Sequence, residues 1–155
     1  MHNKNIKYTI MKKFKILSLT ILSIVLFSCS GKAQENQSKV DKSISEIELI
    51  DFYGTHRCVT CKAIEANARY TLKTYFEKEI KEGLLSFKTI NVDDEKNYKM
   101  AENYQAAGTA LFINVIKNGK ETHIDLTDFA FANGRDQEEF SKELKAKIET
   151  ELKKL

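Results

Sequence analysis

The chain has 155 residues, with 25 basic and 22 acidic side chains and a formal charge of +3. Residues 1–45 hold 8 of the basic and 2 of the acidic groups, which leaves 17 basic and 20 acidic groups for the rest of the chain. This remainder is mildly acidic, so its charge gives no basis for binding nucleic acid. Its length of about 110 residues is enough for one small hydrophobic core.

The chain begins with features of an export signal. Three lysines between residues 12 and 15 precede an apolar run, Ile16–Phe27, that is too short to span a bilayer but has the length of the apolar core of a secretory signal. Cys29 follows, with Leu26 and Ser28 just before it. This pattern resembles a bacterial lipoprotein signal. The resemblance implies that residues 1–28 are removed and that Cys29 carries the lipid.

The residues after Cys29 are predicted to form a tether. Up to about Ser45 they are rich in Gln, Asn, Ser and Lys and contain almost nothing apolar. Ser30 follows Cys29, and no acidic run is present there. The lipoprotein resemblance then implies retention at the outer membrane, facing the periplasm. We therefore expect three parts: a signal (1–28), a lipidated cysteine with its tether (29–45), and one folded domain (46–155).

The first part of this domain predicts a strand and then a helix. Ile47–Tyr53 carries apolar residues on both faces, as expected of a central strand covered on both sides. From Val59 to about Glu82, apolar residues recur every four positions, which predicts one amphipathic helix. Gly83 is expected to end it.

The remaining elements follow from shorter signals. The run 84–92 is apolar and rich in strand-forming residues, and Asp93 and Asp94 are expected to cap a helix that ends near Tyr104. Asn-Gly at 118–119 predicts a hairpin between strands 111–116 and 121–126. A loop with Phe129 and Phe131 comes next, and then a helix that starts with a capping box, Asp136 with Glu139. The predicted order is β-α-β-α-β-β-α.

Cys58 and Cys61 lie where the first strand leads into the first helix. Residues three apart in a first helical turn lie on one face, close enough for a disulfide. The helix N-terminus favours a thiolate at Cys58, and we expect Arg57 and His56 to act in the same direction. Cys58 is therefore the predicted nucleophile and Cys61 the resolving thiol. A CxxC pair between a strand and a helix is typical of redox motifs.

Two other interpretations of the pair compete. In the first, the pair would be half of a structural zinc site. A complete site needs four ligands, and besides the cysteines the domain offers only His56 and His123. A permanent structural disulfide is uncommon at a helix start because such bonds are exposed and easily reduced. If Cys29 carries lipid, the pair is the domain's whole complement of cysteine. In an exported protein it can cycle only with a partner that oxidises or reduces it.

The element order with CxxC at the first helix resembles the thioredoxin core over nearly all of the domain. That resemblance implies an α/β fold whose central four-stranded mixed sheet is covered by helices on both faces. Asp51-Phe52-Tyr53 resembles the strand end of thioredoxins, and Lys117-Asn118-Gly119 resembles their hairpin. The stretch from Phe52 to Glu65 is similar to that of small ArsF-type thioredoxin-like lipoproteins, described as nitroreductase-associated subunits.

The chain departs from thioredoxins in two ways. It contains no proline, so Thr109 or Ala110 stands where thioredoxins have a cis-proline, and a trans peptide is expected there because a cis bond without proline costs about 3 kcal/mol. The residues between the cysteines are Val59 and Thr60, which leaves the direction of electron flow open. The predicted contacts of a substrate chain are Arg57, Val59, Thr60, Thr109 and Ala110.

Four further side chains are assigned by position. Asp51 shares a face with Leu49 beneath the helix of Cys61, where a buried carboxylate could accept the proton of the resolving thiol. An alternative is a partly exposed aspartate at the strand end. His123 is predicted to be a surface strand residue. Phe129 and Phe131 are expected to fill the core or anchor the loop rather than to form a docking patch.

The leading functional hypothesis is a lipid-anchored thiol-disulfide oxidoreductase that exchanges electrons with a protein partner through Cys58 and Cys61. The disulfide itself is the working group, and no cofactor is expected. One alternative is a dithiol module for Cu(I), Zn(II) or As(III), with His56 or Met100 as helper ligands. Another is an accessory subunit that docks to a reductase and transfers no electrons.

Overall fold

The computed structural model describes residues 45–155. The predicted signal, Cys29 and the tether up to residue 44 lie outside these residues. The described part contains ten elements in chain order: β1 (Glu46–Tyr53), α2 (Val59–Tyr75), α3 (Glu77–Lys81), β2 (Leu85–Asn91), the 3-10 helix η1 (Glu95–Asn97), α4 (Tyr98–Asn103), β3 (Ala110–Lys117), β4 (Lys120–Asp125), α5 (Thr127–Asn133) and α6 (Gln137–Leu152).

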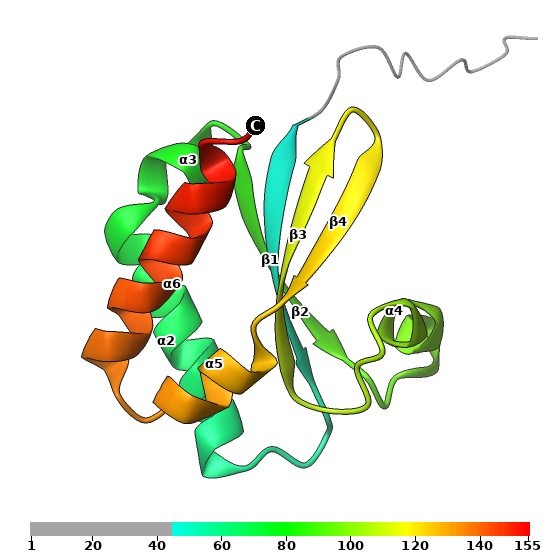
Figure 1. The fold of residues 1–155 in the computed structure, drawn as a ribbon. Helices are drawn as coiled ribbons and strands as arrows, with labels where there is room; N and C mark the ends of the chain where they lie inside the picture. Colours follow the sequence, from blue (N-terminus) through cyan, green and yellow to red (C-terminus); the bar gives the residue numbers. More distant parts are fainter. Residues whose placement is uncertain (1–44) are drawn as a thin grey trace, which may run out of the picture. The chain divides into compact units, whose positions relative to one another are not determined.

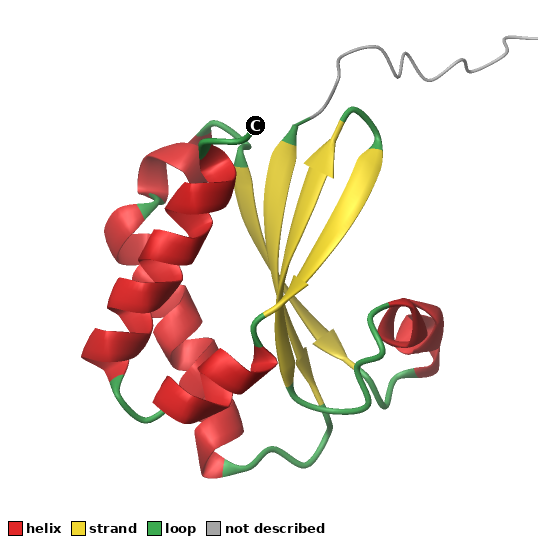
Figure 2. Ribbon diagram, viewed as in Figure 1, coloured by secondary structure: helices red, strands yellow, loops and turns green. Residues whose placement is uncertain are grey.

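The four strands form one mixed sheet in the order β2-β1-β3-β4. β1 is parallel to β2 and antiparallel to β3, and β3 and β4 form an antiparallel hairpin. β1 is therefore a central strand, which explains why its interior positions are buried on both faces. Figure 2 shows helices on both sides of the sheet, with α4 on the side opposite the two long helices. The predicted four-stranded mixed sheet is confirmed.

One face of the sheet is covered by α2, α5 and α6 (Figure 1). Alternate residues of β1, beginning with Ile47 and Leu49, point to this side, since successive side chains of a strand face opposite ways. They pack against the apolar stripes of the two long helices. The other core residues on this face are Ile64, Ala68, Leu72, Phe76, Leu85, Leu111, Ile113, Leu126, Ala130, Phe140, Leu144 and Ile148.

The opposite face carries a smaller core beneath α4. Ile50 and Phe52 of β1 pack there with Phe112 of β3 and with Tyr104, Ala106 and Ala110. The rings of Phe52 and Tyr104 lie 5.1 Å apart, and both rings also contact that of Phe112. Helices thus cover both faces, and together with the strand order this gives a thioredoxin-like α/β fold.

The predicted single helix from Val59 to Glu82 is wrong, because it breaks at Phe76. Phe76 has φ −130° and belongs to neither α2 nor α3. Its backbone N–H still reaches Leu72 O, and its ring is buried in the larger core. The period of four continues across the break because Phe76 remains an inward position, so the apolar stripe alone could not reveal it. Gly83, at φ +74°, ends the segment as expected.

Two further predictions need correction. Asp94 caps only the short 3-10 helix η1, and α4 follows it as a separate six-residue helix. Asp93 does not cap a helix, because its carboxylate accepts the N–H of Thr55 instead. Phe129 and Phe131 lie in helix α5 and not in a loop. With seven residues, α5 is too short to show a clear helical period in the sequence.

The hairpin and the last helix form as predicted. Asn118 and Gly119 both have positive φ, 53° and 72°, as a tight two-residue turn between β3 and β4 requires. Asp136 caps α6 by accepting the N–H of Glu139 at 3.0 Å. Among the helices of residues 45–155, none is both long and apolar enough to cross a membrane.

Candidate active site at the start of helix α2

The loop between β1 and α2 is held in place by the segment after β2. Asp93 accepts the backbone N–H of Thr55 at 2.6 Å, and the Asn91 amide lies 3.3 Å from the Thr55 hydroxyl. Hydrogen bonding from the backbone and side chain of Thr55 lowers the pKa of Asp93, so Asp93 is ionised near neutral pH. Residues almost forty positions later in the chain therefore fix the loop that carries the cysteines.

Cys58 and Cys61 form a disulfide, with sulfurs 2.14 Å apart and Cα atoms 5.1 Å apart. Cys58 is the N-cap of α2, and its sulfur accepts the N–H of Cys61 at 3.0 Å. This is the contact that would stabilise a thiolate at Cys58 once the bond is open. Cys58 is exposed, whereas Cys61 is only 8% exposed. Cys58 therefore presents the sulfur that another protein can reach.

Asp51 is completely buried near the end of β1. One carboxylate oxygen, Oδ2, lies 3.1 Å from Arg57 Nη2, while Oδ1 is buried without a hydrogen-bond partner. Burial raises the pKa of Asp51 from 3.8 to about 7, against the opposing attraction of Arg57. A carboxyl group with this pKa gains or loses a proton readily near neutral pH.

Arg57 turns inward, beneath the first turn of α2. Its Nη2 donates both to Asp51 and to the carbonyl oxygen of Cys61, at 3.0 Å from the latter, while Nη1 bonds the Glu65 carboxylate. The guanidinium also lies 4.6 Å from the centre of the Tyr53 ring. Three of its contacts are therefore with the protein's own acceptors, next to the resolving cysteine.

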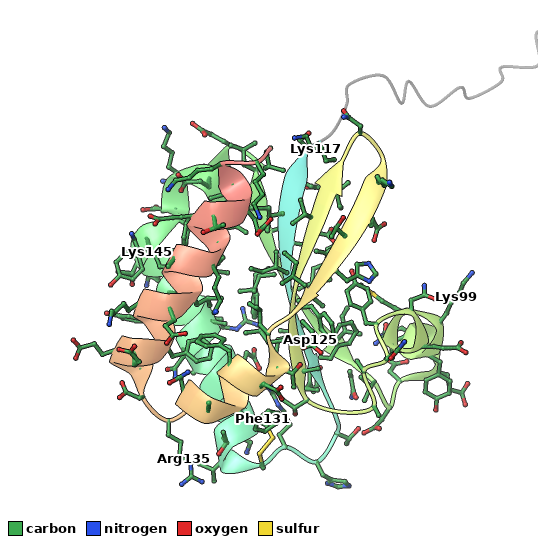
Figure 3. All side chains as sticks on the ribbon, viewed as in Figure 1. Lys99, Lys117, Asp125, Phe131, Arg135 and Lys145 are labelled. Atoms are coloured by element: carbon green, nitrogen blue, oxygen red, sulfur yellow. A yellow bond between two sulfur atoms is a disulfide. The ribbon has the colours of Figure 1, made fainter. Side chains whose placement is uncertain are left out.

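The residues between the cysteines lie at the surface. Val59 is 74% exposed. The Thr60 hydroxyl accepts a hydrogen bond from Arg135 Nε at 3.1 Å. Figure 3 labels Arg135 and Phe131, on the segment around the end of α5, at the end of the molecule where the sulfur–sulfur bond is drawn. Phe131 is 44% exposed, whereas Phe129 packs on Phe140 with ring centres 5.1 Å apart.

The link between α5 and α6 is part of the site, and sequence reasoning missed it. Gly134 packs so closely that a Cβ atom would lie 2.7 Å from Ala130 O and 3.1 Å from the Thr60 methyl. Its carbonyl oxygen accepts a hydrogen bond from Asn67 of α2. The only signal in the sequence is a glycine just before the cap of the last helix. A glycine at such a position usually indicates only the end of one helix and the start of the next.

Ala110 is the first residue of β3, and Thr109 directly precedes it. Ala110 is opposite Phe52 in the sheet register, so Thr109 lies at the edge of the sheet from which β1 enters the cysteine loop. No peptide bond within residues 45–155 is cis. The expected trans peptide is therefore observed at this position.

Other polar features lie away from the cysteines. Within the described residues, no three His, Cys, Asp or Glu side chains are grouped to hold a metal. Met100 packs in the smaller core, and His123 is exposed and stacks on Tyr104 with ring centres 3.8 Å apart. A cavity of about 460 Å³ beside these residues is lined by no residue of the cysteine loop.

Fold and site together define a thioredoxin-like domain with a CxxC disulfide at the mouth of its first helix. No protein-family model and no curated protein matches the sequence. Among solved structures, a thioredoxin from Thermus thermophilus is 19% identical (TM-score 0.44) over 65% of this chain and 72% of that one. A Fasciola hepatica thioredoxin is 23% identical (TM-score 0.38) over 57% and 76% of the two chains.

A further solved structure, described as a malarial protein, is 14% identical over 57% of this chain and 94% of that one, with a TM-score of 0.36. At these levels of identity and overlap the similarities carry no argument about activity. The fold assignment stands on the strand order, the two helical layers and the position of the cysteine pair in the chain itself.

Proposed function

We propose that the protein is a thiol-disulfide oxidoreductase that exchanges electrons with a protein partner. The observation that carries this proposal is the asymmetry of the cysteine pair. Cys58 is exposed at the helix N-terminus and its sulfur accepts a backbone N–H. Cys61 is almost fully buried, and Arg57 Nη2 bonds both its carbonyl oxygen and Asp51. Cys58 is accessible to a partner, whereas Cys61 is shielded from solvent and reacts only in the second step.

The exchange proceeds in two steps. The Cys58 thiolate attacks one sulfur of the partner's disulfide; the partner's sulfur–sulfur bond breaks, and its other sulfur leaves as a thiolate. Cys61 then gives its proton to Asp51 and attacks Cys58, which forms the Cys58–Cys61 bond and releases the partner's second thiolate. Two electrons pass to the partner. The reverse sequence oxidises a partner dithiol, and the relative reduction potentials set the direction.

The proposal includes a location and a class of partner. The lysines, the apolar run and Cys29 near the start of the chain support a lipid anchor. Ser30, in place of an acidic residue directly after Cys29, supports a position at the outer membrane facing the periplasm. The similarity of residues 52–65 to ArsF-type thioredoxin-like lipoproteins supports a reductase complex as the partner.

Trapping tests the proposal directly. Cys61→Ser should accumulate a mixed disulfide through Cys58, because the resolving thiol is missing. Cys58→Ser is the matched control and should trap little. Equal trapping by both variants would contradict the assigned roles. A redox titration of the metal-free protein should show a reversible two-electron couple, and its absence would refute the exchange function itself.

A further inference from the structure

Four charged side chains form a chain from the interior to the surface, which we call the Asp51 ion chain: Asp51, Arg57, Glu65 and Arg69. Arg57 bonds both Asp51 and Glu65, and Arg69 bonds Glu65 from the other side at 2.8 Å. Side-chain exposure rises along it from 0% to 15%, 21% and 55%. Its charges alternate in sign, so each buried group has an opposite charge beside it.

Arg57 is the member that touches the reacting cysteine's own backbone. A single nitrogen, Nη2, directs one N–H to Asp51 Oδ2 and the other to Cys61 O, while Nη1 serves Glu65. The planar, forked guanidinium makes these contacts at fixed angles, which the single ammonium of a lysine cannot reproduce. Arg57 thereby ties β1 to the first turn of α2.

We propose that Arg57 is a positioning residue for the exchange reaction: it links the Asp51 carboxylate to the backbone of the resolving cysteine. Together with Glu65 it keeps the buried charges balanced when Asp51 takes a proton. This inference rests on the proposed function. The Oδ1 atom of Asp51, buried and without a donor, is the oxygen that receives the proton.

Charge balance explains why Glu65 belongs to the arrangement. Before the proton moves, Arg57 lies between two carboxylates. After Cys61 transfers its proton to Asp51, Asp51 is neutral and Arg57 still has Glu65 as its counter-ion. Burial would raise the pKa of Glu65, but hydrogen bonds from Arg57 and Arg69 outweigh it and lower that pKa, so Glu65 remains ionised. Arg57 is never left as an isolated buried cation, which would be strongly unfavourable.

The charged groups that act on Asp51 predict shifts of opposite sign in two variants. Arg57 lowers the pKa of Asp51 and Glu65 raises it, with Arg69 contributing a smaller lowering. Arg57→Met should therefore raise the titration midpoint of Asp51, by roughly 1 to 3 pH units for loss of an adjacent opposite charge. Glu65→Gln should lower it, because a like charge is removed and Arg57 is freed to bond Asp51 alone. Opposite shifts would show that both charges act on Asp51, and the pH profile of exchange tests whether that action matters for the reaction.

The experiment follows the Asp51 carboxyl by carbon NMR in the oxidised protein across pH. It also measures the pH profile of exchange between the reduced protein and an aromatic disulfide reagent. Lys81→Met removes an exposed lysine whose ion-pair partner among residues 45–155 is Glu77 in α3, and it controls for loss of one positive charge. Arg57→Lys keeps the charge and loses the fork. Arg57→Lys should bring the titration midpoint of Asp51 back toward the wild-type value, while the resolving step remains slow. It also provides a folded variant if Arg57→Met does not fold.

The outcomes separate the two proposals. If the wild type exchanges with the reagent but Arg57→Met and Lys81→Met give the same Asp51 midpoint and pH profile, the role of Arg57 is refuted and the proposed function stands. Equal exchange rates in Arg57→Lys and the wild type would also refute it. If the wild type does not exchange at all, both proposals are refuted.

Discussion

Replacing Asp51 by asparagine should stabilise the oxidised protein above neutral pH while slowing exchange. Asp51 is fully buried, and its pKa is raised from 3.8 to about 7, chiefly by burial. This rise of about 3 pH units corresponds to roughly 4 kcal/mol, at about 1.4 kcal/mol per unit. Above pH 7 that is the free energy by which the ionised carboxylate destabilises the folded state. Asparagine has nearly the same shape and does not ionise, so the variant avoids this term.

The gain has an upper limit and a definite pH dependence. Arg57 loses its charged contact in Asp51→Asn but keeps Glu65, so we expect a net gain of about 2 to 4 kcal/mol. Because the pKa of Asp51 is higher in the folded than in the unfolded state, its ionisation makes the wild type lose stability as pH rises from about 4 to about 7. The variant lacks this loss, so the difference is small at low pH and largest above pH 7.

Urea unfolding of the oxidised proteins, followed by circular dichroism from about pH 5 to pH 8, measures this difference directly. Comparing the two proteins at each pH cancels the groups they share, including the carboxylates with lowered pKa. A variant no more stable than the wild type at pH 8, or a stability difference that does not shrink toward pH 5, would contradict the assigned cost of burying ionised Asp51. Exchange by the variant should be slower by about 10²-fold at the resolving step, the usual contribution of a general base.

Three further substitutions test the fold around the site. Gly119→Ala places a side chain at φ +72° and should lower the free energy of unfolding by about 1 to 2 kcal/mol, whereas Gly108→Ala, with open space and no positive φ, should change it little. Gly134→Ala brings a Cβ atom to 2.7 Å from a backbone oxygen and should cost about 1 to 3 kcal/mol; stability equal to wild type would show that this contact relaxes freely. Leu144→Ala should cost about 2 to 5 kcal/mol at a fully buried position, and a smaller loss by urea unfolding would contradict the assigned core.

The strand order was predictable because its signals are local. Apolar residues on both faces of β1 indicate a central strand, and Asn118-Gly119 fixes the hairpin by its own turn geometry. The break at Phe76 was not predictable. It leaves the apolar stripe in phase, and only the fit of the Phe76 ring into the core decides it. Helix α5 is likewise decided by packing on the sheet and on α6, and not by its seven residues alone.

In the site, sequence spacing predicted the cysteine pair. For Asp51 it left a buried carboxylate and a partly exposed one both open, and the structure shows the buried one. It did not predict how Arg57 is used. The position of Arg57 next to Cys58 predicts that its charge stabilises the Cys58 thiolate or that it contacts a substrate. Its direction is decided by two carboxylates, six residues before it and eight residues after it, that lie on the inner side of the loop. Arg135 contacts Thr60 across 75 positions, a distance at which a single sequence carries no pairing signal.

The energetics of the site argue against a purely structural crosslink. The Cys58–Cys61 bond joins residues only three positions apart. Closing so short a loop restricts the unfolded chain by roughly 2 kcal/mol in the chain-entropy relation. Asp51, which Arg57 links to the Cys61 backbone, destabilises the folded protein by up to about 4 kcal/mol above pH 7. The cost of burying this ionisable carboxyl is therefore comparable to or larger than the stabilisation that the disulfide supplies. Proton transfer during thiol exchange gives such a carboxyl a role that a purely structural crosslink does not.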